Sequence, residues 1–356
     1  MQPFAGRAAV AGIGMTALSR MSGRTELELA VEACRAACAD AGIVPRDVDA
    51  VLSYHLNDSA PVVRVARALG IERLGWHNDI AGGGTQAASI LGDAAMLVHA
   101  GLARNILIFR ALNGRSGKRM NTVSTGPQER FTYGMAGPIP MFALAATRYL
   151  HDTGLTAEHL HAVVAQSREN AKANPRAQRR EPLGLDDYLS RPYVCTPLRT
   201  VDCCQETDGA CALLVSGVLD GPRVRAVVRG GGPGCSSMDR APDVTAIFSA
   251  YVAPMLWEAG GMRPSDVDVA LPYDAYSWLV PRQLEDFGLA ERGEMGAYLL
   301  ERRHAWVNPH GGLLSEGYVH GLNNVAQAVR ELRAGREVAL VTGFGGSYGS
   351  AALLTS

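Results

Sequence analysis

The seven cysteines are the side chains of this 356-residue chain whose type and spacing could most directly indicate chemistry. They are Cys34, Cys38, Cys195, Cys203, Cys204, Cys211 and Cys235. An odd number in a large chain argues against a disulfide framework and for a reducing compartment. No pair has the CxxC spacing of a zinc site, so we expect no metal. Cys34 and Cys38, four residues apart, could form a redox pair, but two small buried core residues are the commoner case.

The bulk composition excludes several classes of protein. Hydrophobic residues make up 47% of the chain and charged residues 19%, which excludes a disordered protein. The 34 Lys and Arg residues nearly balance the 35 Asp and Glu residues, so neither nucleic acid nor a membrane surface is an expected partner. The first residues do not resemble a signal peptide, and no apolar run suggests a membrane helix. We therefore expect a cytoplasmic protein.

Apolar strands alternate with helices in the first part of the chain. Strands are predicted at residues 8–13, 48–55, 105–112 and 209–217, and helices at 25–42 and 86–101. This alternation favours a parallel sheet covered on both faces. Residues from about 113 to 197 are richer in Arg, Gly and Pro, with helical stretches near 140–151 and 156–173. We interpret them as an inserted cap.

The same order of elements returns after Gly221. Strands are predicted at residues 223–232, 267–273 and 338–346, and helices at 244–261, 277–287 and 318–332. The segments 22–55 and 241–274 also resemble each other, since each has a helix, glycines, a proline and a strand that begins Val-Asp. We therefore predict two halves, 1–217 with the cap and 218–356, that form one five-layered α/β unit with two stacked sheets.

Three stretches resemble one known family. Residues 163–216, 307–335 and 341–354 are similar to the sterol-carrier-protein (lipid-transfer) branch of the thiolase superfamily. The resemblance covers nearly the whole chain. It implies the duplicated thiolase fold, five-layered αβαβα with two stacked mixed sheets, and a homodimer built across the central sheets. It also implies an acyl-CoA thioester as substrate, with CoA as part of that substrate and no separate cofactor.

Both cysteines that the family uses in catalysis are absent. A Claisen-type thiolase needs a nucleophilic cysteine at the start of a buried helix, where the helix dipole helps to hold the thiolate. Residues 39–194 contain no cysteine. The nucleophile's place falls within Gly82–Thr85, where only Thr85 has a side-chain oxygen. Gly343 or Phe344 takes the place of the second cysteine.

The family's other side-chain catalysts are replaced as well. The histidine of its Gly-His-Pro motif aligns with Tyr318, in the sequence GYVHG at 317–321. Its Asn or His at the end of a strand aligns with Tyr273. The resemblance therefore implies the fold and the CoA ligand but not the thiolase reaction.

Retro-aldol cleavage of a β-hydroxyacyl-CoA needs no nucleophile. A base takes the hydroxyl proton, the Cα–Cβ bond breaks, a ketone leaves and the thioester carries the electrons as an enolate. Backbone N–H groups that bind the enolate oxygen contribute roughly 3–4 kcal/mol per good donor. We expect the proton carriers to be Tyr348, His320, Tyr318 and Tyr273. We expect the backbone oxyanion donors to be Gly84 and Gly346.

Alternative roles stay open for several of these residues. A tyrosine has a pKa of about 10, so it needs a nearby positive charge or donor to act as a base. His320 could supply that, act itself, or make only a structural hydrogen bond. Tyr348 could simply cap the sheet, and Tyr276 is expected to line the pocket or the core. Arg176, Arg179 and Arg180 could bind the CoA phosphates or form an exposed basic cluster.

Some members of this branch lack both cysteines and cleave steroid side-chain CoA thioesters as aldolases, with a small accessory protein that carries a zinc ribbon and an OB-fold. The chain resembles those members, so we expect the same reaction on a bulky substrate and the same kind of partner. Two alternatives remain. The chain could be an acyltransferase or Claisen-type synthase that uses Thr85 or Cys235, or a non-catalytic subunit that binds CoA esters.

Overall fold

The computed structural model describes the chain except for residues 118–128, 136, 234–237 and 239–240. The first half contains β1 (Ala9–Met15), α1 (Glu26–Asp40), β2 (Ala50–His55), α2 (Val62–Leu69), β3 (Trp76–Ala81), α3 (Ser89–His99), β4 (Asn105–Asn113) and β7 (Asp208–Ser216). The second contains β8 (Arg223–Gly231), α8 (Phe248–Gly260), β9 (Val269–Leu271), α9 (Leu279–Asp286), α10 (Met295–Leu300), α11 (Gly312–Ser315), α12 (Leu322–Arg333), β10 (Val338–Phe344) and β11 (Tyr348–Thr355).

Strand pairing repeats between the two halves. The strand order is β3-β2-β4-β7-β1-β8-β11-β10-β9, and β1 meets β8 through the pair Ala9–Arg223. In the first half β2 and β4 are parallel, and β7 pairs antiparallel with both β4 and β1. In the second half β9 and β10 are parallel, and β11 pairs antiparallel with both β10 and β8. The matching pattern confirms the predicted duplication.

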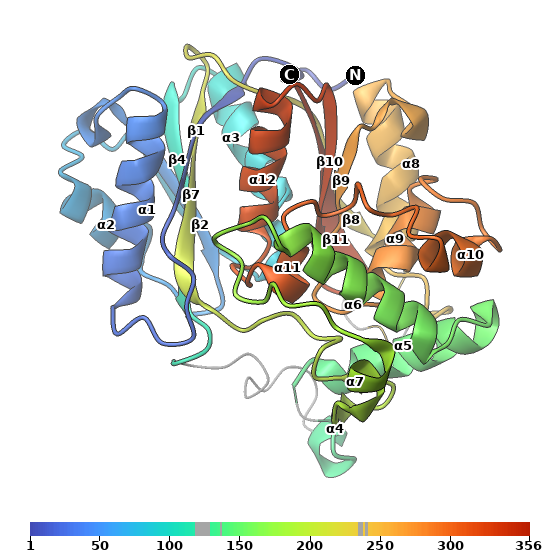
Figure 1. Ribbon diagram of the computed structural model, residues 1–356. Coiled ribbons are helices and arrows are strands. Elements are labelled where there is room, and N and C mark those ends of the chain that lie inside the picture. Colours follow the sequence, from blue (N-terminus) through green and yellow to red (C-terminus); the bar gives the residue numbers. More distant parts are fainter. Residues whose placement is uncertain (118–128, 136, 234–237, 239–240) are drawn as a thin grey trace.

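Helices separate and cover the two sets of strands (Figure 1). Helices α3 and α12 lie between them, α1 and α2 cover one outer face, and α8, α9 and α10 lie on the opposite side. Buried apolar residues form three clusters, one under α1 and α2, one around α3 and α12, and one under α8 and α9. This is the five-layered arrangement that the sequence predicted.

Helix α1 shows how local sequence fixes an element. Thr25 caps it, because its hydroxyl accepts a hydrogen bond from the Glu28 amide while the Glu28 carboxylate accepts one from the Thr25 amide. Cys34 and Cys38 are buried on its inner face and are free thiols, and burial raises the pKa of both. The core interpretation of these two cysteines is confirmed.

The segment predicted to be an inserted cap packs against the second half of the molecule. It contains α4 (Glu129–Thr132), α5 (Ile139–Thr153), α6 (Ala157–Ala171), α7 (Leu185–Ser190), β5 (Tyr193–Cys195) and β6 (Leu198–Arg199). Helix α6 contacts α10 and α11, and the apolar residues of α5 and α6 belong to the same buried cluster as those of α8 and α9. In the part of the chain that the structure describes, no helix combines the length and apolarity needed to cross a membrane.

One predicted boundary near the site is wrong. Helix α12 begins at Leu322, whereas the small-residue pattern predicted a helix from Tyr318. His320 and Gly321 have φ angles of 47° and 82°, a left-handed conformation that a right-handed helix cannot contain. The segment from Tyr318 to Gly321 is therefore an irregular connection that presents its side chains at the start of α12. Strand β3 and helix α2 were also not predicted.

Candidate active site

Two tyrosines from separate segments form the centre of the candidate site. The Tyr273 hydroxyl donates a hydrogen bond to the Tyr318 hydroxyl oxygen at 2.7 Å, and the two rings meet edge to face with their centroids 6.2 Å apart. Tyr273 is 2% exposed, while Tyr318 is partly buried. The structure thus brings together two of the four predicted proton carriers.

The backbone of Tyr273 is held by a closed set of hydrogen bonds. Its amide donates to Thr342 Oγ1 at 2.8 Å, and its carbonyl accepts from Gln283 Nε2 at 3.0 Å. The Thr342 hydroxyl donates to Gln283 Oε1 at 2.6 Å, which links β10 to α9 behind the tyrosine. This support fixes the Tyr273 ring, as acid–base geometry requires.

Tyr273 occupies the space that a side chain at residue 84 would need. A Cβ atom added to Gly84 would lie 2.0 Å from the Tyr273 hydroxyl oxygen. The resemblance places the nucleophilic cysteine within Gly82–Thr85, so the hydroxyl of Tyr273, a residue distant in sequence, occupies the space beside that position. A Cβ on Gly343, one of the two candidates for the place of the second cysteine, would lie 2.5 Å from the Gly84 carbonyl oxygen, so backbone closes that position.

Gly84 begins a short 3₁₀ turn, Gly84–Gln86, that leads into α3. The first N–H groups of such a turn have no acceptor within it, and they lie at its positive end. Gly84 is buried. The oxyanion role of its amide stays a prediction.

His320 is the third predicted residue at this place. Its ring is 4.8 Å from the Tyr318 ring, centroid to centroid, and its Cε1 atom would lie 3.6 Å from a Cβ on Gly83. The side chain is fully buried, and its Nδ1 accepts hydrogen bonds from Arg110 Nε at 3.0 Å and Nη2 at 2.8 Å. Burial and the Arg110 charge lower the pKa of His320 to about 3, so the ring is neutral near pH 7.

Arg110 and Asp58 are site residues that sequence reasoning missed. Arg110, on β4, is fully buried and forms an ion pair with Asp58 at 2.7 Å. Burial raises the pKa of Asp58, but Arg110 and His320 together leave it below its usual value. An arginine inside the otherwise apolar strand NILIFRAL was the available signal, because a buried charge requires a partner.

Burial sets the protonation state of the two tyrosines. It raises the pKa of Tyr273 well above the ordinary value, and the neighbouring Tyr318 raises it further. Burial also raises the pKa of Tyr318, while the hydrogen bond from Tyr273 and the charge of Arg110 act in the opposite direction. Both phenols are therefore protonated at neutral pH, and the Tyr318 anion is the better stabilised of the two.

The structure does not bring Tyr348 into this group. Tyr348 begins β11 with 45% of its surface exposed, and its hydroxyl makes no hydrogen bond to another described residue. Its carbonyl accepts from the Gly345 amide at 3.1 Å and so closes a tight turn. Gly346, in that turn, has a φ of 100°, and its carbonyl accepts from the Phe248 amide at 2.9 Å. The catalytic role of Tyr348 stays a prediction.

Other nucleophiles lack the surroundings that would activate them. The Thr85 side chain is 5% exposed, and its methyl group fills the space beside Gly345. Burial raises the pKa of Cys203 to about 12 and that of Cys204 well above its usual range, which keeps both as thiols. Cys235 lies outside the described residues. Within the described ranges, no group of His, Cys, Asp and Glu side chains could hold a metal ion.

The three arginines considered for CoA binding differ in their surroundings. Arg176 is bound to the buried Glu316 at 3.0 Å, so its charge is already paired. Arg180 is exposed, and Arg179 is partly buried. Burial and the charges of nearby arginines lower the pKa of Arg179. The phosphate-binding prediction therefore concerns Arg179 and Arg180 only.

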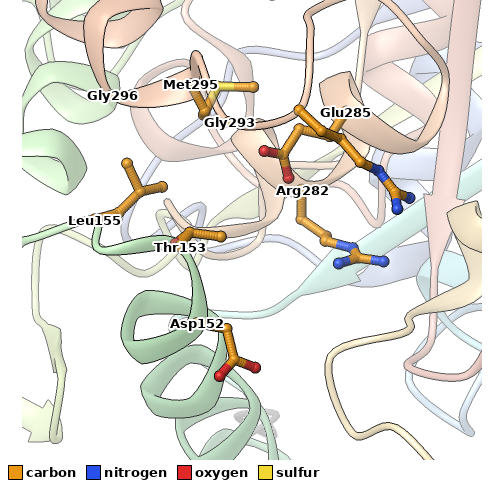
Figure 2. A pocket seen from close by; sticks show the side chains of 9 residues that line it. Asp152, Thr153, Leu155, Arg282, Glu285, Gly293, Met295 and Gly296 are labelled. Atoms are coloured by element: carbon orange, nitrogen blue, oxygen red, sulfur yellow. The ribbon is translucent and has the colours of Figure 1, made fainter.

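A separate cavity of about 250 Å³ lies between the end of α5 and the segment from α9 to α10 (Figure 2). Charged side chains line it, among them Asp152, Arg282 and Glu285. None of the predicted catalytic residues contributes to its wall. It is therefore not the site built around Tyr273 and Tyr318.

Comparisons with known proteins identify the family of the chain. A family model described as "Thiolase C-terminal domain-like" matches residues 234–355. The chain is 35% identical to the 17-hydroxy-3-oxo-4-pregnene-20-carboxyl-CoA lyase of Mycobacterium tuberculosis, over 95% of this chain and 96% of the relative. It is also 35% identical to the steroid side-chain-cleaving aldolase of Thermomonospora curvata, over 94% and 92% of the two chains. A solved structure described as "Ltp2-ChsH2(DUF35) aldolase" superposes with a TM-score of 0.92 and 33% identity, covering 100% of this chain and 99% of that one.

Proposed function

This chain belongs to the thiolase superfamily, together with its steroid side-chain-cleaving CoA aldolases, and from that membership we propose that it cleaves the Cα–Cβ bond of a β-hydroxyacyl-CoA. The enzyme is a carbon–carbon lyase. Its substrate carries a bulky acyl group of the steroid side-chain type, and the products are a ketone and a short acyl-CoA. The β-hydroxyl group loses one proton and Cα gains one, so the reaction is balanced and needs no other reactant.

One observation supports this reaction above the others. The Tyr273 hydroxyl fills the side-chain space of Gly84, and it is hydrogen-bonded to Tyr318. A covalent acyl-enzyme therefore has no nucleophile at that position, while two groups that can move a proton stand there instead. Retro-aldol cleavage requires proton transfer and enolate stabilisation and nothing else.

We assign the proton transfer to Tyr318. Its oxygen accepts the Tyr273 hydrogen bond, and a donor to the charged form lowers a pKa, so Tyr273 helps Tyr318 to lose its proton. In its ionised form Tyr318 takes the proton of the substrate β-hydroxyl, and it returns that proton to Cα after the bond has broken, which restores the phenolate. The partial exposure of Tyr318 allows a substrate to reach it, whereas Tyr273 is enclosed.

The developing enolate oxygen requires hydrogen-bond donors. We assign the Gly84 amide to this role because it opens the turn before α3, and the Gly346 amide because it lies in the glycine turn before β11. A Cβ on Gly345 would lie 2.0 Å from the Thr85 methyl group. The turn that contains Gly84 and the glycine turn that contains Gly346 therefore lie side by side. His320 completes the set of side chains beside Gly83.

Product analysis tests this function. The chain, co-purified with its accessory protein, is incubated with a steroid β-hydroxyacyl-CoA, and the mixture is analysed by mass spectrometry. We expect equal amounts of ketone and short acyl-CoA, with the protein mass unchanged. Release of free CoA from a ketoacyl-CoA, or an acyl adduct on the protein, would support the transferase instead. Binding of the ester without turnover in the complete assembly would indicate a non-catalytic subunit.

The assembly that we propose is a homodimer with a small accessory protein that carries a zinc ribbon and an OB-fold. Strand β3 ends the sheet, and its free edge includes Trp76, which is 43% exposed. An uncovered edge strand is a site for pairing with another chain, so a second copy can extend the sheet there. The solved aldolase that resembles the chain carries a two-component description, which supports the accessory protein.

Light scattering tests the assembly. We expect the chain to form a dimer that binds the accessory protein, and Trp76→Glu to shift the equilibrium toward the monomer. A monodisperse monomer of the unmodified chain in the presence of the accessory protein would contradict this assembly.

A further inference from the structure

A buried polar network holds the ring and the main-chain carbonyl of His320. Arg110 Nε and Nη2 donate to Nδ1 of His320, and Asp58 pairs with the same guanidinium at 2.7 Å. The Tyr54 hydroxyl donates to the His320 carbonyl oxygen at 2.9 Å. These contacts come from β2, from the segment after it and from β4.

Arginine determines which nitrogen of the His320 ring carries the proton. A guanidinium has only donors, so Nδ1, which receives both bonds, must be unprotonated. The neutral ring then carries its hydrogen on Nε2. Among the described residues Nε2 has no hydrogen-bond partner, although it is buried. A buried donor without an acceptor is rare in proteins and indicates a missing partner.

That donor lies beside the turn assigned to the oxyanion. The Cε1 and Nδ1 atoms of the ring lie 3.6 Å and 3.8 Å from the Cβ position of Gly83, the residue before Gly84. The Tyr318 ring meets the imidazole edge to face, with the two centroids 4.8 Å apart. The His320 ring therefore lies beside the residue that precedes the Gly84 amide, with its unpaired Nε2 buried at the same place.

We propose that Arg110 is a positioning residue that fixes His320 as a neutral Nε2–H donor to the enolate oxygen, so that His320 binds the oxyanion and transfers no proton. This inference rests on the proposed cleavage for its ligand. Asp58 forms an ion pair with Arg110 and fixes its guanidinium. The Arg110 charge polarises the imidazole through its hydrogen bonds to Nδ1, and this strengthens Nε2–H as a donor. The group thereby supplies a third donor, from a side chain, beside the two backbone amides.

Substitutions of His320 separate a donor from a proton carrier. Glutamine places an N–H close to the position of Nε2 but cannot exchange a proton. We expect His320→Ala to lower kcat by about 10²–10³, the loss seen when one oxyanion donor is removed. We expect His320→Gln to recover at least about tenfold of that loss, with KM nearly unchanged. Equal rates for the two variants would overturn the donor role.

A matched pair of double variants tests Arg110. In Asp58→Asn/Arg110→Gln and Asp58→Asn/Arg110→Met the buried ion pair is removed, so the two proteins carry the same charge. Glutamine has its amide nitrogen where Arg110 has Nε and can still donate to Nδ1, whereas methionine has a methyl group there. We expect the methionine protein to have a kcat lower by about tenfold or more at similar KM, because a tautomer that is not fixed weakens the donor. Equal kcat values would overturn the positioning role.

Nitrogen NMR of the imidazole gives a readout that does not depend on turnover. In the unmodified chain we expect the His320 signals, identified by their loss in His320→Gln, to show a protonated Nε2 and an unprotonated Nδ1 throughout the neutral pH range. The glutamine double variant should keep this pattern and the methionine double variant should lose it. A protonated Nδ1 in the unmodified chain, or the same spectrum in both variants, would overturn the inference. If the complete assembly does not cleave the ester but the spectra follow expectation, the proposed function fails while the positioning by Arg110 stands.

Discussion

Replacing Tyr318 by phenylalanine removes one oxygen atom from the centre of the site and keeps the ring in place. That oxygen accepts the Tyr273 hydrogen bond at 2.7 Å and, in the proposed reaction, takes the proton of the substrate hydroxyl. Proton transfer by a positioned side chain contributes about 10²–10⁴-fold to the rate. We therefore expect kcat to fall by at least about two decades. KM should change little, because the lost interaction belongs to the transition state.

The same substitution has a cost in stability that can be compared with Tyr273→Phe. Without the Tyr318 oxygen, the buried Tyr273 hydroxyl has lost its acceptor, which costs about 1–3 kcal/mol. Tyr273→Phe should cost less, about 1 kcal/mol, because the partly exposed Tyr318 hydroxyl can bind water instead. Thermal unfolding of the two variants should therefore rank Tyr318→Phe below Tyr273→Phe.

The pH dependence gives a third measurement on the same pair. Burial raises the pKa of Tyr318, so the fraction of the base form, and with it kcat, should increase as the pH rises through the alkaline range. Tyr273→Phe removes the donor that lowers this pKa, so the alkaline limb should move to higher pH. A limb that stays in place would show that Tyr273 does not act on the base.

The assay measures ketone formation from a saturating β-hydroxyacyl-CoA in the presence of the accessory protein. Tyr276→Phe is the control, since Tyr276 is 7% exposed and its ring packs against Phe142 at 5.3 Å. Tyr348→Phe tests the residue that the sequence favoured. If Tyr318→Phe and Tyr273→Phe both keep near-normal rates while Tyr348→Phe loses two decades or more, the assignment to the buried pair is refuted and the proton carrier is the exposed tyrosine at the start of β11.

Three further predictions concern residues around this pair. Gly84→Ala should abolish cleavage without unfolding the chain, because its Cβ would lie 2.0 Å from the Tyr273 hydroxyl; normal turnover of a folded variant would contradict this. Alkylation of the accessible cysteines should leave turnover largely intact, as measured by the same assay, and a large loss in a folded protein would favour the transferase. Burial raises the pKa of Asp274 to about 7, so the folded state binds its proton more tightly than the unfolded state does. Its contribution to stability should be present below about pH 4 and decrease as the pH rises to about 7, a slope that Asp274→Asn should flatten in Tm measurements.

Much of the fold could be predicted because its signals are local. Apolar runs and helical spacing identified β1, α1, β4 and β7 to within a few residues, and Thr25, where the first helix was predicted to begin, is the N-cap of α1. The echo between the two halves predicted the repeated strand pairing. The start of α12 was missed because the left-handed conformation of His320 depends on its contacts with Arg110 and Tyr54, which no local pattern encodes.

The catalytic group was only partly predictable for the same reason. Tyr273, Tyr318 and His320 were found through their places in family motifs, and the structure brings these three together. Tyr348 follows a glycine turn that equally suggests an active site, but such a turn does not specify whether the next side chain points inward. Arg110 was hidden in an apolar strand because its two partners are distant in sequence. Asp58 lies 52 positions before it (110 − 58 = 52), and His320 lies 210 positions after it.

The loss of the thiolase nucleophile and the gain of the tyrosine pair are linked by one steric constraint. Gly84 has no side chain, and this absence leaves room for the Tyr273 hydroxyl against the turn that opens α3. A cysteine at residue 84 would need that same space, so restoring it requires a smaller residue at position 273. A smaller residue there would remove the donor that stabilises the Tyr318 anion. A nucleophilic cysteine and the tyrosine pair therefore exclude each other in this fold, and an enzyme with Gly84 and Tyr273 is committed to chemistry without an acyl-enzyme.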